Sequence, residues 1–167
     1  MNPSEQIINP EYNDNFFRWY EGSVLCYEDG SPLIFYHKSR SNKVFSEFRL
    51  TDVVKGIDKT CHGYFFVERS KKGDIEWIAD GIEVYAFLKM LKPFYIYDNN
   101  GHPSDQDRNS LGAIVINKPY VDSLISRGFD GIIIVGGYNQ YVVFNEKQIK
   151  SVNNSGAYNP DTADIYN

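Results

Sequence analysis

Short aromatic and β-branched segments, each bounded by glycine, proline or charged residues, recur along most of the chain and restrict what it can fold into. The clearest patterns that predict a helix cover residues 13–21 and 121–126. Many short strands with few helices favour an α+β domain. The predicted strands lie at residues 32–37, 63–67, 83–91, 129–135 and 141–144. The run at 33–36 is apolar on both faces, which indicates a strand in the interior of a sheet.

The connections between these segments are predicted from their turn residues and charges. Residues 23–37 are expected to form a β-hairpin around a turn at 28–30. Residues 94–97 are expected to continue the strand at 83–91 beyond Pro93. The charged segment 68–78 can hold one helix that carries Ile75 and Trp77 inward, with Lys71 and Lys72 in solvent. We expect a flexible leader at 1–12, a mobile loop at 98–110 and a single domain over 13–167.

Composition narrows the class of protein. The 167 residues, 42% of them hydrophobic, suffice for one compact core. A net charge of −5 argues against a dedicated duplex-DNA binder, which needs a basic face, but leaves room for a local nucleic-acid groove. Cys26 and Cys61 are too few and too far apart for a metal site, and the N-terminus lacks the pattern of a signal peptide. These features predict a reduced, cytoplasmic protein without a bound metal.

Three segments, in their order and spacing, resemble one known family. Leu-Ile-Phe-Tyr-His-Lys-Ser at 33–39 resembles a strand that ends in Tyr-His-Gly-Ser, Gly-Tyr-Phe-Phe at 63–66 resembles a glycine-x-aromatic-Phe strand, and Asn-Gln-Tyr-Val-Val-Phe at 139–144 resembles Asn-Glu-Tyr-Ile-Val-Tyr. The three patterns that these segments resemble are those of the ADP-ribosyltransferase fold, in its histidine-containing branch that includes diphtheria-toxin-like and PARP-like enzymes. Further segments are similar to ADP-ribosyltransferase domains of phage-head and polyvalent proteins: 17–23 with 29–33, 85–89 with 92–93, 128–133, and 148–151 with 161–165.

The resemblance implies a fold, a reaction and a set of partners. The expected fold is α+β, with two packed, mostly antiparallel sheets around an NAD cleft and a few short helices. The expected reaction cleaves the bond between nicotinamide and ribose in NAD, the co-substrate, and transfers ADP-ribose to a protein or to a nucleic-acid base. The expected setting is a bacterial cytoplasm, where the domain acts as a toxin or anti-phage defence effector, with an antitoxin or inhibitor protein as a further partner.

The same resemblance assigns roles to the residues of the first segment. His37 is expected to hydrogen-bond the adenosine ribose, since an imidazole both donates and accepts. Lys38 stands where the family has glycine, whose backbone pairs with the nicotinamide amide, and Ser39 fits the adjacent hydroxyl position. Tyr36 is expected beside them in the NAD site.

The aromatic partners of nicotinamide are expected in the second segment. Phe65 matches the tyrosine that stacks on the ring, and phenylalanine keeps the π face while losing the hydroxyl. A slip of one residue presents Tyr64 instead, because strand alternation sends only one of the two to the site. Trp77 is the candidate for the second stacking residue, with a place in the hydrophobic core as the equal alternative.

Gln140 stands where the family has its catalytic glutamate. Glutamine keeps the shape and the hydrogen bonding but removes the charge that stabilises an oxocarbenium-like transition state, at a cost on the order of 10²-fold in rate. Three explanations stay open: a slow or substrate-assisted transferase, an inactive module that binds NAD or a partner, and a Glu-to-Gln inactivated form of a toxic enzyme. Glu146 lies six residues farther along and is expected to be too distant to substitute.

Overall fold

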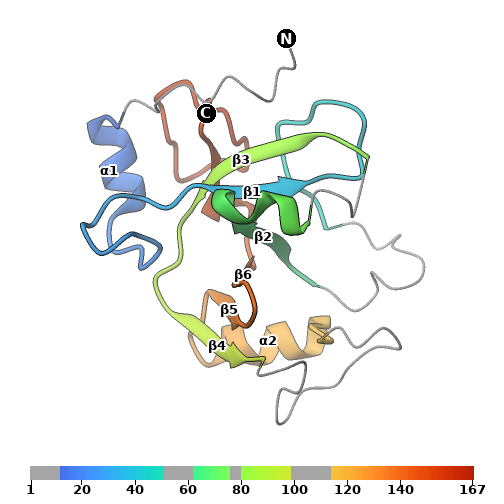
Figure 1. Cartoon of the computed structure of the whole chain (residues 1–167). Coiled ribbons are helices and arrows are strands. Elements are labelled where there is room, and N and C mark those ends of the chain that lie inside the picture. The colour runs from blue at the N-terminus through green and yellow to red at the C-terminus, as the bar shows by residue number, and fades with distance from the viewer. Residues whose placement is uncertain (1–11, 51–61, 76–79, 99–113) are drawn as a thin grey trace.

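The computed structural model describes residues 12–50, 62–75, 80–98 and 114–167. Its elements, in chain order, are α1 (Asp14–Tyr20), β1 (Phe35–Lys38), β2 (Tyr64–Glu68), the 3-10 helix η3 (Arg69–Asp74), β3 (Glu83–Leu88), β4 (Pro93–Tyr97), α2 (Lys118–Ser126), β5 (Gly131–Val135), β6 (Gln140–Val143), the 3-10 helix η6 (Glu146–Gln148) and β7 (Ile149–Ser151). The strands form a sheet in the order β4-β5-β6-β2-β1-β3-β7 (Figure 1). Neighbouring strands are antiparallel except for the parallel pair β4 and β5. The predicted α+β class is confirmed.

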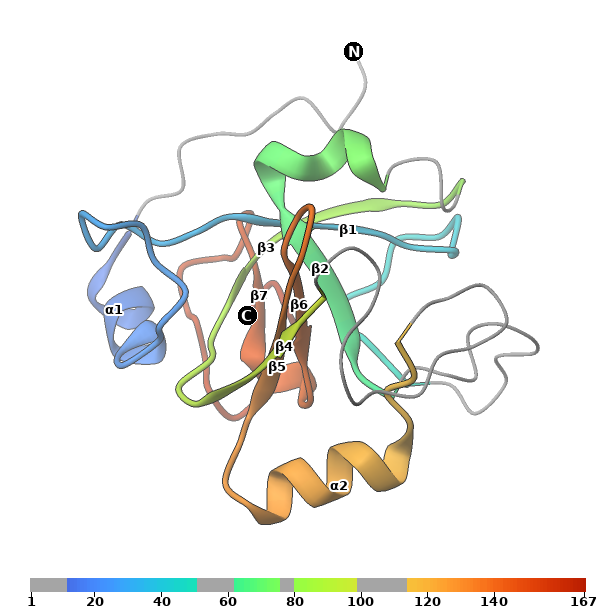
Figure 2. The ribbon, with the colours of Figure 1, turned by 60° about the horizontal axis from the view of Figure 1, so that its bottom comes forward.

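The expectation of two separate packed sheets is wrong for the described residues, because all seven strands belong to one hydrogen-bonded order. The sheet is strongly twisted, and Figure 2 shows β1 and β3 crossing steeply over the direction of β5 and β6. Right-handed twist accumulates from strand to strand. Strands at the two ends therefore point in different directions without any break in the pairing.

Helix α1 follows the sequence pattern closely. The side chain of Asn13 accepts a hydrogen bond from the Phe16 N–H at 2.9 Å and caps the helix. The helix ends at Tyr20, and Gly22 then adopts a φ of 77°, a conformation that favours glycine. The predicted helix at 13–21 is confirmed.

The hairpin before β1 is also present, in a shorter form. Its strands meet through a single bridge between Cys26 and Pro32, and the N–H of Leu33 donates to the carbonyl of Leu25 at 3.1 Å. β1 lies between β2 and β3, as expected for a strand that is apolar on both faces.

The largest departure from the predicted elements is β4. The chain leaves β3 at Leu88, turns, and reappears as β4 at the opposite edge of the sheet, parallel to β5. The carboxylate of Asp130 holds this turn by accepting from the N–H groups of Leu91 (2.7 Å) and Lys92 (2.8 Å). Residues 94–97 therefore do not continue the strand at 83–91, because the turn carries them across the sheet.

Helix α2 stands between β4 and β5 in the chain and starts three residues earlier than predicted. Asn117 caps it by accepting from the Tyr120 N–H at 3.0 Å, and Pro119 occupies its first turn. Among the described residues, no helix is long and apolar enough to cross a membrane.

The described part of the charged segment, residues 68–75, contains η3 rather than a helix with an inward apolar side. None of the η3 residues is buried, and Ile75 is half-buried just after it. Trp77 and Cys61 lie outside the described residues, as do residues 1–11 of the predicted leader and 99–110 of the predicted loop.

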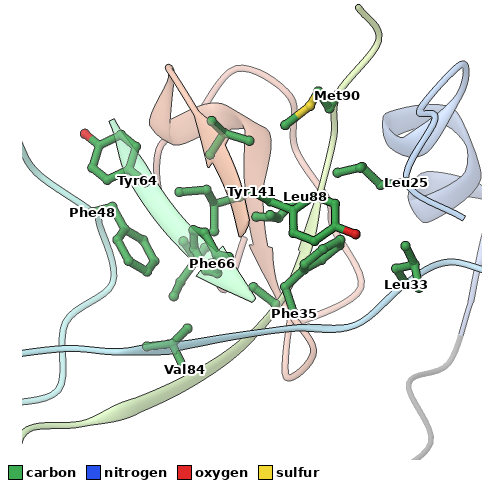
Figure 3. Packing of buried hydrophobic residues seen from close by; sticks show 14 of the residues in the cluster. Leu25, Leu33, Phe35, Phe48, Tyr64, Phe66, Val84, Leu88, Met90 and Tyr141 are labelled. Carbon is green, nitrogen blue, oxygen red and sulfur yellow. The ribbon is translucent and has the colours of Figure 1, made fainter. Parts of the chain in front are cut away.

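The two faces of the sheet are covered differently. One face, here called the core face, carries a continuous apolar cluster, part of which is drawn in Figure 3. The other, here called the helix face, carries two separate clusters, one under α1 with Phe87 and one under α2 with Ile132 and Val142. The strand residues of the core face are Phe35, Tyr64, Phe66, Val84, Ala86, Leu88, Ile133, Tyr141, Val143 and Ile149.

The C-terminal tail is fixed by an interaction that the apolar pattern does not indicate. Tyr158 and Ile165 are buried as expected, at 3% and 0% exposure. Lys150 is also fully buried, and its ammonium donates to the carbonyls of Thr162 (3.1 Å), Asp164 (2.9 Å) and Asn167 (2.6 Å). A buried cation needs such partners, so Lys150 joins β7 to the tail.

Candidate functional site

β1 and β2 separate after two residue pairs. Phe35 opposes Glu68 and Tyr36 opposes Val67, and the pairing ends there. β1 stays paired with β3 as far as Lys38, while β2 is paired with β6 from Tyr64 to Val67. We call the place where the two strands part, between residues 37–39 and 64–66, the divergence.

The imidazole of His37 bridges the divergence. Its Nδ1 lies 2.7 Å from the carbonyl oxygen of Phe65. Because a carbonyl only accepts, we assign the proton to Nδ1, which leaves Nε2 as an acceptor when the ring is neutral. Burial lowers the pKa of His37 below its ordinary value, against the smaller opposite effect of the hydrogen bond to Phe65. His37 is therefore neutral at pH 7.

The ring of His37 lies on the core face. Its centroid is 5.1 Å from that of Phe48 and 5.2 Å from that of Phe66. Within the part of the chain that the structure describes, no hydrogen-bond partner is found for Nε2. Among the described residues, His37 thus combines an apolar environment with an acceptor atom, Nε2, for which no partner is found.

Strand alternation separates Tyr64 from Phe65. Tyr64 is only 7% exposed and packs edge-on against Phe48 in the core, at a centroid distance of 5.6 Å (Figure 3). Phe65 is half-buried on the helix face and packs against the apolar cluster under α2. Exposing Tyr64 to a ligand would disrupt the core, so the structure favours Phe65 as the aromatic residue with a free face.

Gln140 begins β6 and lies on the helix face. It opposes Val67 on β2, which in turn opposes Tyr36 on β1. Directly opposed residues of antiparallel strands share a face, so these three side chains point the same way. Gln140 is half-buried, and among the described residues its side-chain amide has no hydrogen-bond partner.

The predicted catalytic residues are thus only partly brought together. Phe65 and Gln140 share the helix face, whereas His37 lies on the core face and reaches the divergence from the other side. Resemblance in three segments could not reveal this, because it gives no register between strands. The predicted roles of all three residues in NAD chemistry stay predictions.

Lys38 and Ser39 follow on the β1 side of the divergence. The ammonium of Lys38 lies 3.5 Å from the Glu83 carboxylate. Tyr158 is the one non-glycine residue with positive φ among those described, so the backbone at Lys38 accommodates a side chain without strain. The Ser39 hydroxyl accepts from the Ser41 N–H at 2.9 Å. A Cβ at Gly81 would overlap the Ser39 carbonyl oxygen, so glycine is required where β3 approaches this segment.

Glu83 is the centre of a polar cluster on the helix face that the sequence analysis missed. Its Oε1 accepts from the hydroxyl of Tyr36 at 3.3 Å, and its Oε2 accepts from the ammonium of Lys72 at 3.0 Å and from the hydroxyl of Tyr85 at 3.4 Å. The expectation that Lys72 is simply solvated is wrong, since it is held by this carboxylate and lies over the Tyr36 ring. A signal existed, because alternation in the 83–91 strand places Glu83 on the same face as Tyr85 and Phe87.

The charges in this cluster stabilise one another. Burial alone would raise the pKa of Glu83, but the hydrogen bond and charge of Lys72, together with the charge of Lys38, hold that pKa below its ordinary value. The hydrogen bond to Glu83 raises the pKa of Lys72, so both groups are ionised at neutral pH. The described residues contain no group of three or more His, Cys, Asp or Glu side chains placed to hold a metal ion.

Comparison with known proteins identifies the family. The family model described as ADP-ribosyltransferase in polyvalent proteins matches residues 27–158, a span that includes β1, β2 and β6 with the divergence between them. Searches of curated proteins and of solved structures each returned no match. The match extends over well more than half of the chain. The chain therefore belongs to the family of ADP-ribosyltransferase domains found in polyvalent proteins.

Proposed function

We propose that this domain is an NAD-dependent mono-ADP-ribosyltransferase, which cleaves NAD at the bond between nicotinamide and ribose and passes ADP-ribose to a macromolecular acceptor. One observation carries the proposal: the family match at 27–158 spans all three NAD-associated segments. The geometry agrees with it in part, because His37 and Phe65 meet at the divergence and Gln140 shares the helix face with Phe65.

The residues at the divergence can supply separate parts of this chemistry. The neutral His37 offers Nε2 as an acceptor for a ribose hydroxyl. Phe65 offers an aromatic face for nicotinamide, and the backbone of Lys38 offers an N–H and a carbonyl to its amide. These groups orient NAD without supplying charge. Orientation alone contributes strongly to catalysis when reacting groups are held in place.

Position 140 decides how fast such a site can react. A carboxylate there would stabilise the positive charge that develops on ribose, whereas the amide of Gln140 can only hydrogen-bond. The chain in its present form is therefore expected to be slow. Gln140 is also the observation that favours a second function, a catalytically inactive module that binds NAD or a protein partner.

Exchange of this one residue separates the two functions. In the Gln140→Glu variant, NAD consumption is expected to rise on the order of 10²-fold or more over the parent protein. Asn117→Asp is the matched control, because it adds the same charge at the cap of α2, where aspartate also caps well. NAD consumption by the Gln140→Glu variant alone supports the interpretation that the parent chain is a disabled enzyme. No NAD consumption by any of the three proteins supports the binding module.

The proposed setting is a bacterial cytoplasm, with a role as a toxin or anti-phage effector restrained by an antitoxin or inhibitor protein. The acceptor is a protein side chain or a nucleic-acid base. Incubation of the Gln140→Glu variant with labelled NAD and separate protein, RNA and DNA pools identifies the class of the acceptor. Growth arrest on expression of Gln140→Glu, but not of the parent, supports the toxin role.

A further inference from the structure

We propose that Glu83 is a positioning residue for NAD binding. It fixes the divergence between β1 and β2 by tying Lys38 of β1 and Lys72 of η3 to β3. The inference rests on the proposed function, because it concerns how the same site is held in shape. Glu83 itself acts through its neighbours and has no assigned contact with NAD.

The carboxylate of Glu83 is shared by several polar groups. Two ammonium groups and two phenol hydroxyls, from Tyr36, Lys38, Lys72 and Tyr85, lie within 3.5 Å of its two oxygens. The Glu83 and Lys38 side chains are each 16% exposed and Lys72 is 31% exposed. These contacts are more sheltered than surface ion pairs, which contribute little.

The short helix η3 brings Lys72 to Glu83. It follows β2 directly, and the N–H of Arg69 donates to the carbonyl of Ile34 just before β1 at 2.9 Å. Lys72, one turn farther along, then reaches Glu83 and lies 5.4 Å and 5.9 Å from the ring centroids of Tyr36 and Tyr85. η3 therefore begins at the paired end of β1 and β2, where Phe35 opposes Glu68. From there the Lys72 side chain reaches Glu83, which opposes Lys38 on the β1 side of the divergence.

Glu83 also balances the charge of this cluster. One carboxylate neutralises two ammonium groups that approach it from different elements. Without the charge of Glu83, the ammonium groups of Lys38 and Lys72 repel each other in a partly buried environment. Both side chains then lower their free energy by moving toward water. Movement of Lys38 shifts the backbone that is expected to pair with the nicotinamide amide. Movement of Lys72 releases η3 from the sheet.

The test compares Glu83→Gln, which keeps the shape, with Glu83→Asp, which keeps the charge. Glu47→Gln is the matched control, since Glu47 pairs with Arg49 at 3.2 Å in an exposed position. Two quantities are measured on the full chain: amide hydrogen exchange in peptides covering 34–39 and 69–75, and the dissociation constant for NAD by calorimetry. Unfolding temperature is recorded to confirm that each variant folds.

Glu83→Gln is expected to speed exchange in both peptides and to raise the NAD dissociation constant on the order of tenfold, because small displacements of positioned groups weaken binding steeply. Glu83→Asp is expected to change the exchange rates and the NAD dissociation constant less than Glu83→Gln does. Glu47→Gln is expected to change neither quantity. Unchanged exchange in folded Glu83→Gln overturns the proposal. Faster exchange with unchanged NAD affinity also overturns it, since Glu83 is then merely structural. Absence of NAD binding in the unmodified protein overturns the proposed function, and the exchange result still decides whether Glu83 holds the divergence.

Discussion

The two faces of the sheet differ in the side chains that they carry. The core face carries one unbroken apolar cluster that runs from β7 to β5, with Phe35 and Phe66 at 0% and 1% exposure. The two apolar clusters of the helix face lie at its ends, under α1 and α2. Between those ends lie charged and polar side chains, those of Tyr36, Lys38, Lys72, Glu83 and Gln140.

This difference shows where the fold can accommodate chemistry. Packing holds the core face, so a ligand could enter it only at the expense of buried contacts. The middle of the helix face depends instead on hydrogen bonds and ion pairs, which can exchange partners. His37 connects the two, because its ring packs among aromatic residues while Nδ1 holds the carbonyl of Phe65 across the divergence.

The largest effect is expected from a cavity in the core face. Phe66→Ala is expected to lower the free energy of unfolding by about 3–5 kcal/mol, because Phe66 is 1% exposed and its neighbours cannot fully close the space. Urea titration measures the change. Val44→Ala, at a residue 79% exposed, is the control and should stay within about 0.5 kcal/mol of the parent. A loss under about 1 kcal/mol for Phe66→Ala would contradict a continuous core.

A matched pair on β2 compares the two faces directly. Tyr64→Ala is expected to cost about 3 kcal/mol of stability, since Tyr64 is 7% exposed and packs on Phe48. Phe65→Ala, at a half-buried residue, is expected to cost about half as much, and yet to remove the stabilisation that NAD gives the parent protein. Urea titration with and without NAD measures both the loss of stability and the loss of stabilisation by NAD. Loss of the NAD effect in Tyr64→Ala instead would show that the other face of β2 meets the ligand.

A smaller effect is expected from the protonation of His37. Burial lowers the pKa of His37 in the folded protein below 6.5, so the unfolded chain takes up a proton first as the pH falls. Stability contributed by the neutral ring is full above about pH 6.5 and is lost progressively as the pH falls through the lower folded-state pKa. Urea midpoints between pH 8 and 5 should decline less steeply in His37→Gln than in the parent. An equal decline in both proteins would place the titrating group elsewhere.

Much of the fold was predictable because local chemistry specifies it. Asn13 and Gly22 mark the ends of α1, and the apolar run before His37 correctly predicts an interior strand. The pairing of distant segments was not predictable. Residues 93–97 have the pattern of a strand, but nothing in that pattern shows that they cross to the far edge and pair with β5.

The site was predictable in its residue types and not in its geometry. Resemblance pointed to His37, Phe65 and Gln140, yet their faces depend on strand register, and a shift of one residue reverses the face. The polar contacts of Lys72 and Lys150 were missed for a related reason. A lysine is solvated by default, and only tertiary structure shows that a carboxylate or a set of carbonyls has been brought to it.

NAD binding at the divergence is tested most directly by thermal unfolding with and without NAD. For the parent protein we expect a rise on the order of 5 °C when NAD is about 100-fold above its dissociation constant. His37→Ala should lose most of this rise, whereas Lys118→Ala on α2 should keep it. No shift in the parent protein, or an equal shift in His37→Ala, would contradict the assignment of the NAD site to the place where β1 and β2 part.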